Sequence, residues 1–174
     1  MESLDEKTAL ELYEHASLHE LGAAAEAECV RRHPQPWRTF VVDRDLQEES
    51  LANGRGCFTA FIGWPFQSPN TSLASEGQAG DAILGSVPYL RMLSIFRLFL
   101  NKMDNIQVSL LTQGVRVGQA ALRYGANDMG GLMMEENVVA ATGTRFRITR
   151  DDMVNLIRQA GYEPRQRDGF YSLA

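Results

Sequence analysis

Cysteine is scarce in this chain of 174 residues. The two that occur, Cys29 and Cys57, form neither a CxxC pair nor the dense set of a disulfide-stapled domain. We therefore expect two reduced thiols and a cytoplasmic location. A catalytic thiol would need a neighbouring base or a positive field, and no motif beside either cysteine provides one.

Long apolar runs and clusters of basic residues are missing as well. The most apolar stretch, residues 84–100, is interrupted by Pro88, Arg91 and Arg97, so no membrane span is predicted. The opening residues show no charged-then-apolar leader, and no secretory signal is expected. The net charge is −5 and the basic residues are scattered along the chain, which argues against a nucleic-acid partner.

Histidine is also rare, and this limits the metal sites that the chain could build. His15 and His19 stand four positions apart, as do Cys29 and His33, a spacing that can place two ligands on one face of a helix. The first pair straddles a predicted helix break, and the second runs into a proline. Because a structural zinc site needs four ligands in a closed geometry, we expect no metal site.

Helix starts are marked by capping boxes, in which a serine or threonine is followed three residues later by an acidic residue. The three boxes are Ser3–Glu6, Ser17–Glu20 and Thr149–Asp152. They predict helices over about 4–15 and 18–32, and a third that begins near residue 150 and ends at Gly161. A longer helix is predicted over 81–103. Its polar stripe is narrow, so we expect it to pack on more than one side.

Four runs of the chain predict strands. Residues 39–42 are β-branched and aromatic, and residues 57–62 are continuously apolar, as in a parallel strand covered on both faces. Residues 106–113 alternate, with Ile106 and Val108 on the face that would meet helices and Gln107 on the inward face. A helix over 115–124 and a strand from 126 complete a βαβ unit. The fold class is therefore α/β.

Two polar clusters lie where strands and helices meet. Gln113 follows the alternating strand, and Asn127 and Asp128 begin the next one, leading on to Glu135 and Glu136. Because β/α barrels bind ligands at the carboxyl ends of their strands, these groups could grip a polar, hydroxyl-rich ligand. The alternative is a simple turn at residues 127–130 and two solvated acids in the first turn of a helix.

Taken together, four strings resemble one family of radical S-adenosylmethionine (SAM) enzymes. They are residues 58–67 (FTAFIGWPFQ), 112–114 (TQG), 125–128 (GAND) and 133–139 (MMEENVV). As a set they are similar to the dehypoxanthine futalosine cyclases, also called cyclic dehypoxanthine futalosine synthases, of menaquinone biosynthesis. The resemblance implies a β/α barrel, a 4Fe-4S cluster with SAM, and a nucleoside-like substrate. The substrate-binding groups that it implies here are Gln113, Asn127, Asp128, Glu135 and Glu136.

The chain departs from this family at one decisive place. A looser similarity covers residues 10–44, after which the family continues into a CxxxCxxC loop and several further strand–helix units. Here Asp45 follows Arg44 directly, inside what resembles the helix before the sixth strand. Cys29 and Cys57 are too few to hold the cluster, so we expect no catalysis and no bound cofactor. The alternatives are a non-catalytic remnant that binds a ligand, a partner or itself, and a truncated or misassembled coding sequence.

The departure leaves a fold that can be specified. If each strand keeps its family position, the order in space is sixth, seventh, eighth, first, which makes a four-stranded parallel sheet and half a barrel. We expect a helical segment over 1–38 and the partial barrel over 39–174. The strands near Phe58 and Thr39 would be open edges, and unpaired edges template association, so we expect a symmetric homodimer.

Overall fold

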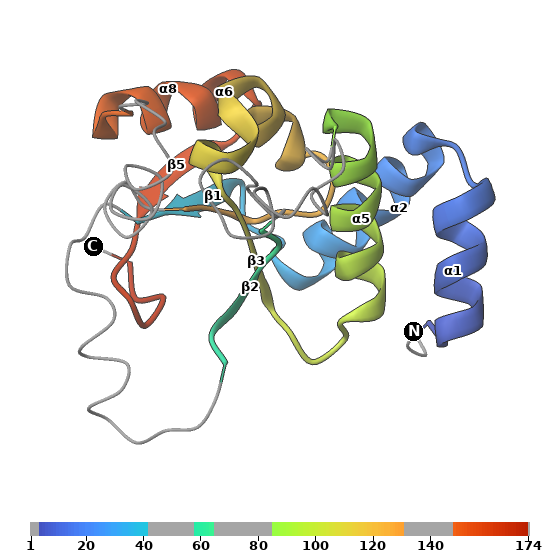
Figure 1. Cartoon of the computed structure of the whole chain (residues 1–174). Helices are drawn as coiled ribbons and strands as arrows, with labels where there is room; N and C mark the ends of the chain where they lie inside the picture. The colour runs from blue at the N-terminus through green and yellow to red at the C-terminus, as the bar shows by residue number, and fades with distance from the viewer. Residues whose placement is uncertain (1–3, 42–57, 65–84, 131–147, 174) are drawn as a thin grey trace, which may run out of the picture.

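The computed structural model describes residues 4–41, 58–64, 85–130 and 148–173. Within these ranges a parallel sheet is covered by helices on one face (Figure 1). The helices are α1 (Glu6–His15), α2 (Leu18–Arg32), α5 (Ser86–Phe99), α6 (Leu110–Ala121) and α8 (Arg150–Gln159). The strands are β1 (Trp37–Phe40), β2 (Ala60–Ile62), β3 (Asn105–Val108), β4 (Asp128–Met129) and β5 (Glu163–Gln166). The predicted α/β class is confirmed.

Two of the predicted capping boxes form completely. In α2 the Ser17 side chain accepts from the backbone N–H of Glu20 while the Glu20 carboxylate accepts from that of Ser17, and Thr149 with Asp152 does the same for α8. The first helix differs from its prediction. Asp5 caps α1 by accepting from the Thr8 N–H at 2.7 Å, so the helix begins at Glu6, and Ser3 lies outside the described residues.

The strand order is β2-β3-β4-β1-β5, and all pairings are parallel. The first four strands confirm the predicted spatial order. The fifth was not predicted: β5 pairs with β1 from Trp37↔Glu163 to Phe40↔Gln166. The expectation that the strand near Thr39 is an open edge was therefore wrong. A strand with a proline and two charged residues among four lacks the usual apolar signal.

Two element ends also differ from the predictions. Strand β3 stops at Val108 rather than at residue 113, because Ser109 caps α6 by accepting from the N–H of Thr112 at 3.3 Å. Gly114, at φ 77°, interrupts the first part of α6, in a conformation that glycine adopts without strain. Helix α5 ends at Phe99 rather than at residue 103. The predicted helical turn over 45–52 lies outside the described residues.

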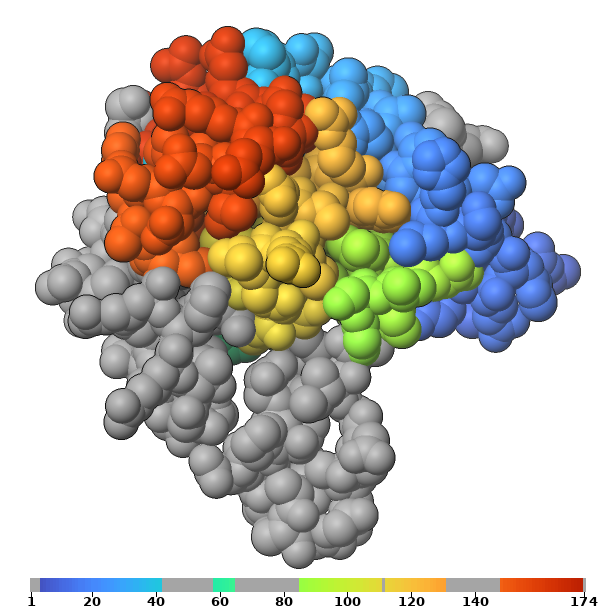
Figure 2. Space-filling view, turned by 90° about the horizontal axis from the view of Figure 1, so that it is seen from above, coloured from blue at the N-terminus to red at the C-terminus, as the bar shows by residue number. Residues whose placement is uncertain are grey.

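The two faces of the sheet have opposite character. On the helical face the strands present Phe40, Ile106, Val108 and Met129, all buried against α5, α6 and α8. Figure 2 looks onto this side, where atoms of the segments that contain α5, α6 and α8 form much of the visible surface. The opposite face is polar, and Gln107 lies on it as the predicted alternation over residues 106–113 implied. It is the inner face of the half-barrel, and the chain after β5 folds back along it (Figure 1).

The polar stripe of α5 is turned towards protein rather than solvent. Ser94 and Arg97 are fully buried. Arg91 donates to the carbonyl oxygens of Tyr13 at 3.0 Å and Ala16 at 2.6 Å, so its cation satisfies the orphan carbonyls at the end of α1. The expectation that this helix packs on more than one side is confirmed. Among the described helices, none has the length and apolar character needed to cross a bilayer.

Candidate functional site

A buried carboxylate organises the inner face of the sheet. Asp128 Oδ1 accepts from the hydroxyl of Thr39 at 2.6 Å and from Nε of Arg167 at 2.8 Å. Its Oδ2 accepts from Nε2 of Gln107 at 2.7 Å, from Nη2 of Arg167 and from the phenol of Tyr171 at 3.2 Å. The carboxylate therefore joins β1, β3, β4 and the segment after β5 through five hydrogen bonds.

The segment after β5 is held over this carboxylate by a compact turn. Asp168 accepts from the backbone N–H groups of Phe170 at 2.8 Å and Ser172 at 2.9 Å, and Tyr171 takes a φ of 64°. The Arg167 guanidinium lies 3.7 Å from the centroid of the Tyr171 ring. Burial, together with the nearby Asp128 charge, raises the pKa of the Tyr171 phenol. The phenol therefore stays protonated, and its O–H donates a hydrogen bond to Asp128.

A second buried network surrounds Asn127. Its Oδ1 accepts from Nη2 of Arg97 at 2.7 Å and from the backbone N–H of Ile106 at 2.8 Å. Its Nδ2 donates to Oδ1 of Asn105 at 2.9 Å. Arg97 also donates to the carbonyl oxygens of Gly125 at 2.7 Å and Asp104 at 2.8 Å. This network fixes the orientation of the Asn127 amide at the start of β4.

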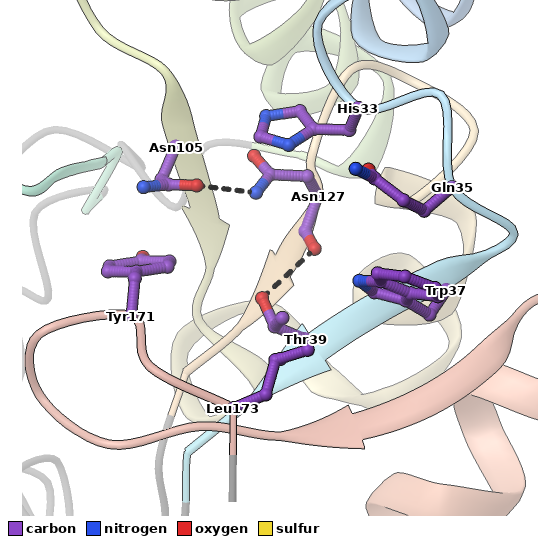
Figure 3. Close-up of a pocket in the computed structure, with 8 residues that line it drawn as sticks. All are labelled: His33, Gln35, Trp37, Thr39, Asn105, Asn127, Tyr171 and Leu173. Atoms are coloured by element: carbon purple, nitrogen blue, oxygen red, sulfur yellow. Dashed lines mark hydrogen bonds between the residues drawn. The ribbon is translucent and has the colours of Figure 1, made fainter.

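Beside the two networks lies a cavity of about 240 Å³ (Figure 3). It sits at the amino ends of β1, β3 and β4, because Trp37 and Asn105 open their strands and Asn127 precedes its own. Figure 3 shows Trp37 and Tyr171 on opposite sides of the space, with Thr39 and Asn127 between them. The lining residues are His33, Gln35, Trp37, Thr39, Asn105, Asn127, Tyr171 and Leu173.

The structure separates the residues that were predicted to bind substrate together. Asn127 lines the cavity at the amino ends of the strands, and Asp128 lies deeper on the inner face, already bonded. Gln113 is in the first turn of α6, at the carboxyl end of β3. Glu135 and Glu136 lie outside the described residues. Their joint role in binding stays a prediction.

Several residues of this region were not predicted from the sequence. Gln35 precedes β1 and Trp37 opens it, and neither residue belongs to a recognisable motif. Arg167 and Tyr171 reach the site only because the segment after β5 turns back, and a tyrosine with a positive φ has no sequence signature. Gln107 was placed on the inward face by alternation alone, but its partner Asp128 comes from a different strand.

The thiols do not fit an iron–sulfur cluster, for which protein ligands are thiolates. Cys29 is fully buried in α2, its Sγ 3.8 Å from the carbonyl oxygen of Ala126. Burial raises the pKa of this thiol, which disfavours the thiolate. Cys57 lies outside the described residues. Within the described ranges no cluster of three or more His, Cys, Asp or Glu side chains could hold a metal ion.

Comparison with known proteins gives a consistent picture. A family model described as the CofH/MqnC C-terminal region matches residues 55–174. The chain is 42% identical over 130 residues to a cyclic dehypoxanthine futalosine synthase of Halalkalibacterium halodurans, covering 75% of this chain and 32% of that protein. It is 42% identical over 128 residues to a protein of the same name from Streptomyces coelicolor, covering 74% of this chain and 30% of that protein.

A second group of relatives is more distant. The chain is 30% identical over 162 residues to a 5-amino-6-(D-ribitylamino)uracil–L-tyrosine 4-hydroxyphenyl transferase of Methanococcus aeolicus, covering 89% of this chain and 43% of that protein. The chain thus spans about a third of the length of the synthases and less than half of that transferase. The higher identity lies with the synthases.

Proposed function

This chain belongs to the CofH/MqnC family of radical SAM enzymes, and from that membership we propose that it is a non-catalytic half-barrel related to the synthases. The full synthase reaction would be the cyclisation of dehypoxanthine futalosine on the route to menaquinone. We propose that the chain keeps part of the barrel sheet but cannot generate the radical that initiates that reaction. Retained synthase activity is the competing function, and the 42% identity to two synthases favours it.

The number and environment of the thiols carry the proposal. A 4Fe-4S cluster supplies the chemistry that generates the radical from SAM, and the protein holds it through closely spaced cysteine thiolates. This sequence has two cysteines, and Cys29 is fully buried with its Sγ against the carbonyl oxygen of Ala126, in the turn before β4. Exposing Cys29 would mean dismantling the packing around it.

We expect no cluster after anaerobic reconstitution of the 174-residue chain with iron and sulfide. Iron and sulfide analysis should give amounts well below one cluster per chain, and the absorption of a cluster should be missing. Incubation with SAM and dithionite should yield no 5′-deoxyadenosine. The physical reason is that the chain has two cysteines, whereas a CxxxCxxC loop supplies three closely spaced thiolates.

A matched variant separates a genuine cluster from adventitious iron. Cys57→Ser removes one of the two thiols and should leave the small background of bound iron unchanged. Stoichiometric iron that falls in this variant, together with 5′-deoxyadenosine formed by the unaltered chain, would show that the chain is an active enzyme and that the proposal is wrong.

We also propose that the half-barrel keeps part of a substrate surface. Gln113, at the carboxyl end of β3, has the position at which β/α barrels bind ligands, and Asn127 and Asp128 support the neighbouring strand. Asp128 is saturated by protein donors, so its part would be to position Thr39, Gln107 and Arg167. Glu135 and Glu136 complete the proposed nucleoside-like ligand site.

We propose that the chain associates with itself, and we now place the contact at β2 alone. The outer edge of β1 is covered by β5, and β5 carries Pro164, which has no N–H to donate. Among the described strands, β2 pairs only with β3. Its flanks expose Phe58 at 88% and Trp64 at 46%. Exposed edges and apolar side chains favour pairing, and a two-fold axis would align two β2 edges antiparallel.

Sedimentation velocity over a hundredfold dilution series tests this pairing. We expect a concentration-dependent species near twice the 19.4 kDa chain mass. Phe58→Lys places a charge at the edge without disturbing a buried contact, and it should shift the equilibrium towards the monomer. A single monomeric species at every concentration would remove the support for a dimer.

A further inference from the structure

We propose that the cavity beside Trp37 binds an uncharged planar heteroaromatic ring, of the size and polarity of a nucleobase. The cavity lies at the amino ends of β1, β3 and β4. The ligand surface proposed above lies at the carboxyl end of β3, near Gln113. The two proposals therefore concern opposite ends of the sheet and stand independently.

Two aromatic side chains flank the space. Trp37 and Thr39 lie two residues apart and share the inner face of β1, while Tyr171 comes from the segment after β5 (Figure 3). Each ring is held in place by a guanidinium: Arg167 lies 3.7 Å from the centroid of Tyr171 and Arg165 lies 5.6 Å from that of Trp37. Tyr171 is anchored by its contact with Arg167 and by its hydrogen bond to Asp128, so binding costs little ordering of that side chain.

The lining is electrically neutral. His33 places Nε2 at 2.8 Å from the carbonyl oxygen of Asp104, which assigns the proton to Nε2 and leaves Nδ1 as an acceptor. Burial lowers the pKa of His33, so the ring is uncharged at pH 7. Two buried arginines lie beside the lining: Arg167 pairs with Asp128, and Arg97 donates to the Gly125 and Asp104 carbonyls and to Oδ1 of Asn127. Arg165 lies 3.7 Å from the Glu163 carboxylate. The donors of both guanidiniums are thus directed to acceptors of the protein, which favours an uncharged ligand over a phosphate or a carboxylate.

Unused hydrogen-bonding groups line the same space. Figure 3 shows the indole nitrogen of Trp37 and the amide of Gln35 directed towards it. Within the described part of the chain neither group has a hydrogen-bond partner, whereas Asn105 and Asn127 bond to each other. Together with Nδ1 of His33 they provide donors and an acceptor. A ring that carries both donors and acceptors on its edge matches this set, and a purely apolar ring does not.

The size of the cavity limits the ligand further. Sites for drug-sized ligands measure roughly 300–1,000 Å³, so a cavity of about 240 Å³ suits a single ring system. Aromatic stacking rewards planar molecules of any base identity. A sugar has no aromatic ring and would gain no stacking energy. A nucleotide would bring a phosphate whose charge the lining does not neutralise.

The fluorescence of Trp37 provides the test. The chain has two tryptophans, and Trp64→Phe leaves Trp37 as the sole indole emitter. We expect adenine to change its emission saturably, with a dissociation constant in the millimolar range. Benzoate, which is planar but charged, and glucose, which is polar but not planar, should produce no saturable change. An equal response to benzoate would overturn the neutral-ligand assignment.

Two glutamine variants locate the binding. Gln35 is exposed and without a partner among the described residues, so Gln35→Leu should fold normally and weaken adenine binding roughly two- to tenfold. Gln159→Leu, on the exposed face of α8, should leave binding unchanged. Amide shifts in an NMR titration should gather at residues 33–39, 105 and 171. Shifts confined to the start of α6, or no saturable response, would overturn this proposal without touching the cluster prediction.

Discussion

Replacing Asp128 by asparagine should lower the free energy of unfolding by about 3–5 kcal/mol, the cost of breaking a buried ion pair by removing one partner. The substitution keeps the volume and removes the charge. It leaves the Arg167 guanidinium, whose side chain is 4% exposed, without its counter-ion. The new amide nitrogen would also face a donor of Arg167, which cannot accept a hydrogen bond.

The effect is large because small domains are stable by only about 5–15 kcal/mol. Urea unfolding followed by far-ultraviolet circular dichroism measures it directly. Asp151→Asn is the matched control: its side chain is 87% exposed beside Arg150, and it should change stability by less than about 0.5 kcal/mol. A loss below about 1 kcal/mol for Asp128→Asn would contradict the role assigned to this network.

A double variant tests whether the loss comes from the stranded charge. In Asp128→Asn/Arg167→Met the buried cation beside residue 128 is gone, and a methionine fills its space with apolar atoms. Because removing both partners of a buried pair often costs less than removing one, we expect part of the lost stability to return. If the double variant instead has a lower free energy of unfolding than Asp128→Asn, the stranded charge is not the main cause of the loss. Hydrogen bonding to Thr39 and Tyr171 then dominates over charge pairing.

Local signals predicted the regular elements well. The capping boxes at Ser17 and Thr149 depend on residues three positions apart, so the sequence contains all that is needed to place those helix starts. The order of the first four strands also followed, but from family resemblance, since strand order depends on contacts between distant segments. Residues 106–108 carry enough apolar character to show that β3 is covered by helices. The expectation that the apolar run before Gly63 is covered on both faces was wrong, because Phe58 is 88% exposed and Ile62 is 38% exposed.

The elements that were missed depend on tertiary contacts. Strand β5 forms because β1 offers it a free edge, and its own residues show little strand propensity. The narrow polar stripe of α5 predicted packing on more than one side, but not that Arg97 would be fully buried with carbonyl oxygens as its partners. The inner-face site also depends on contacts between distant segments. Asn127 and Asp128 were identified by their position, whereas their bonds to Arg97 and Arg167 depend on chain segments far away in the sequence.

Gly125 illustrates how a local and a distant cause combine. The sequence predicts it as a helix stop, and its φ of 99° agrees with that role. The structure adds a second reason: a Cβ at this position would lie 2.7 Å from Cβ of Arg97. Arg97 in turn donates to the Gly125 carbonyl at 2.7 Å. The glycine therefore lets α5 and the turn before β4 approach closely enough for this bond.

Arg97→Met should lower the free energy of unfolding by about 2–4 kcal/mol. The guanidinium donates to the Gly125 and Asp104 carbonyls and to Oδ1 of Asn127, and its loss leaves buried acceptors short of a donor, each costing about 1–3 kcal/mol. Burial lowers the pKa of Arg97, which shows that the charged form is disfavoured there. Methionine relieves that desolvation, so the net loss should be smaller than the sum of the bonds.

The readout can separate this loss from a general weakening of the fold. Arg116→Met on the exposed side of α6 should change stability by less than about 0.5 kcal/mol. In Arg97→Met the backbone amide of Ile106, which bonds to Oδ1 of Asn127, should exchange hydrogen faster relative to amides of α8, because the Asn127 side chain loses the donor that orients it. Unchanged exchange at Ile106 with full stability would show that Asn127 is held by β3 alone. In that case the cavity beside Trp37 would keep its shape without the cation of α5.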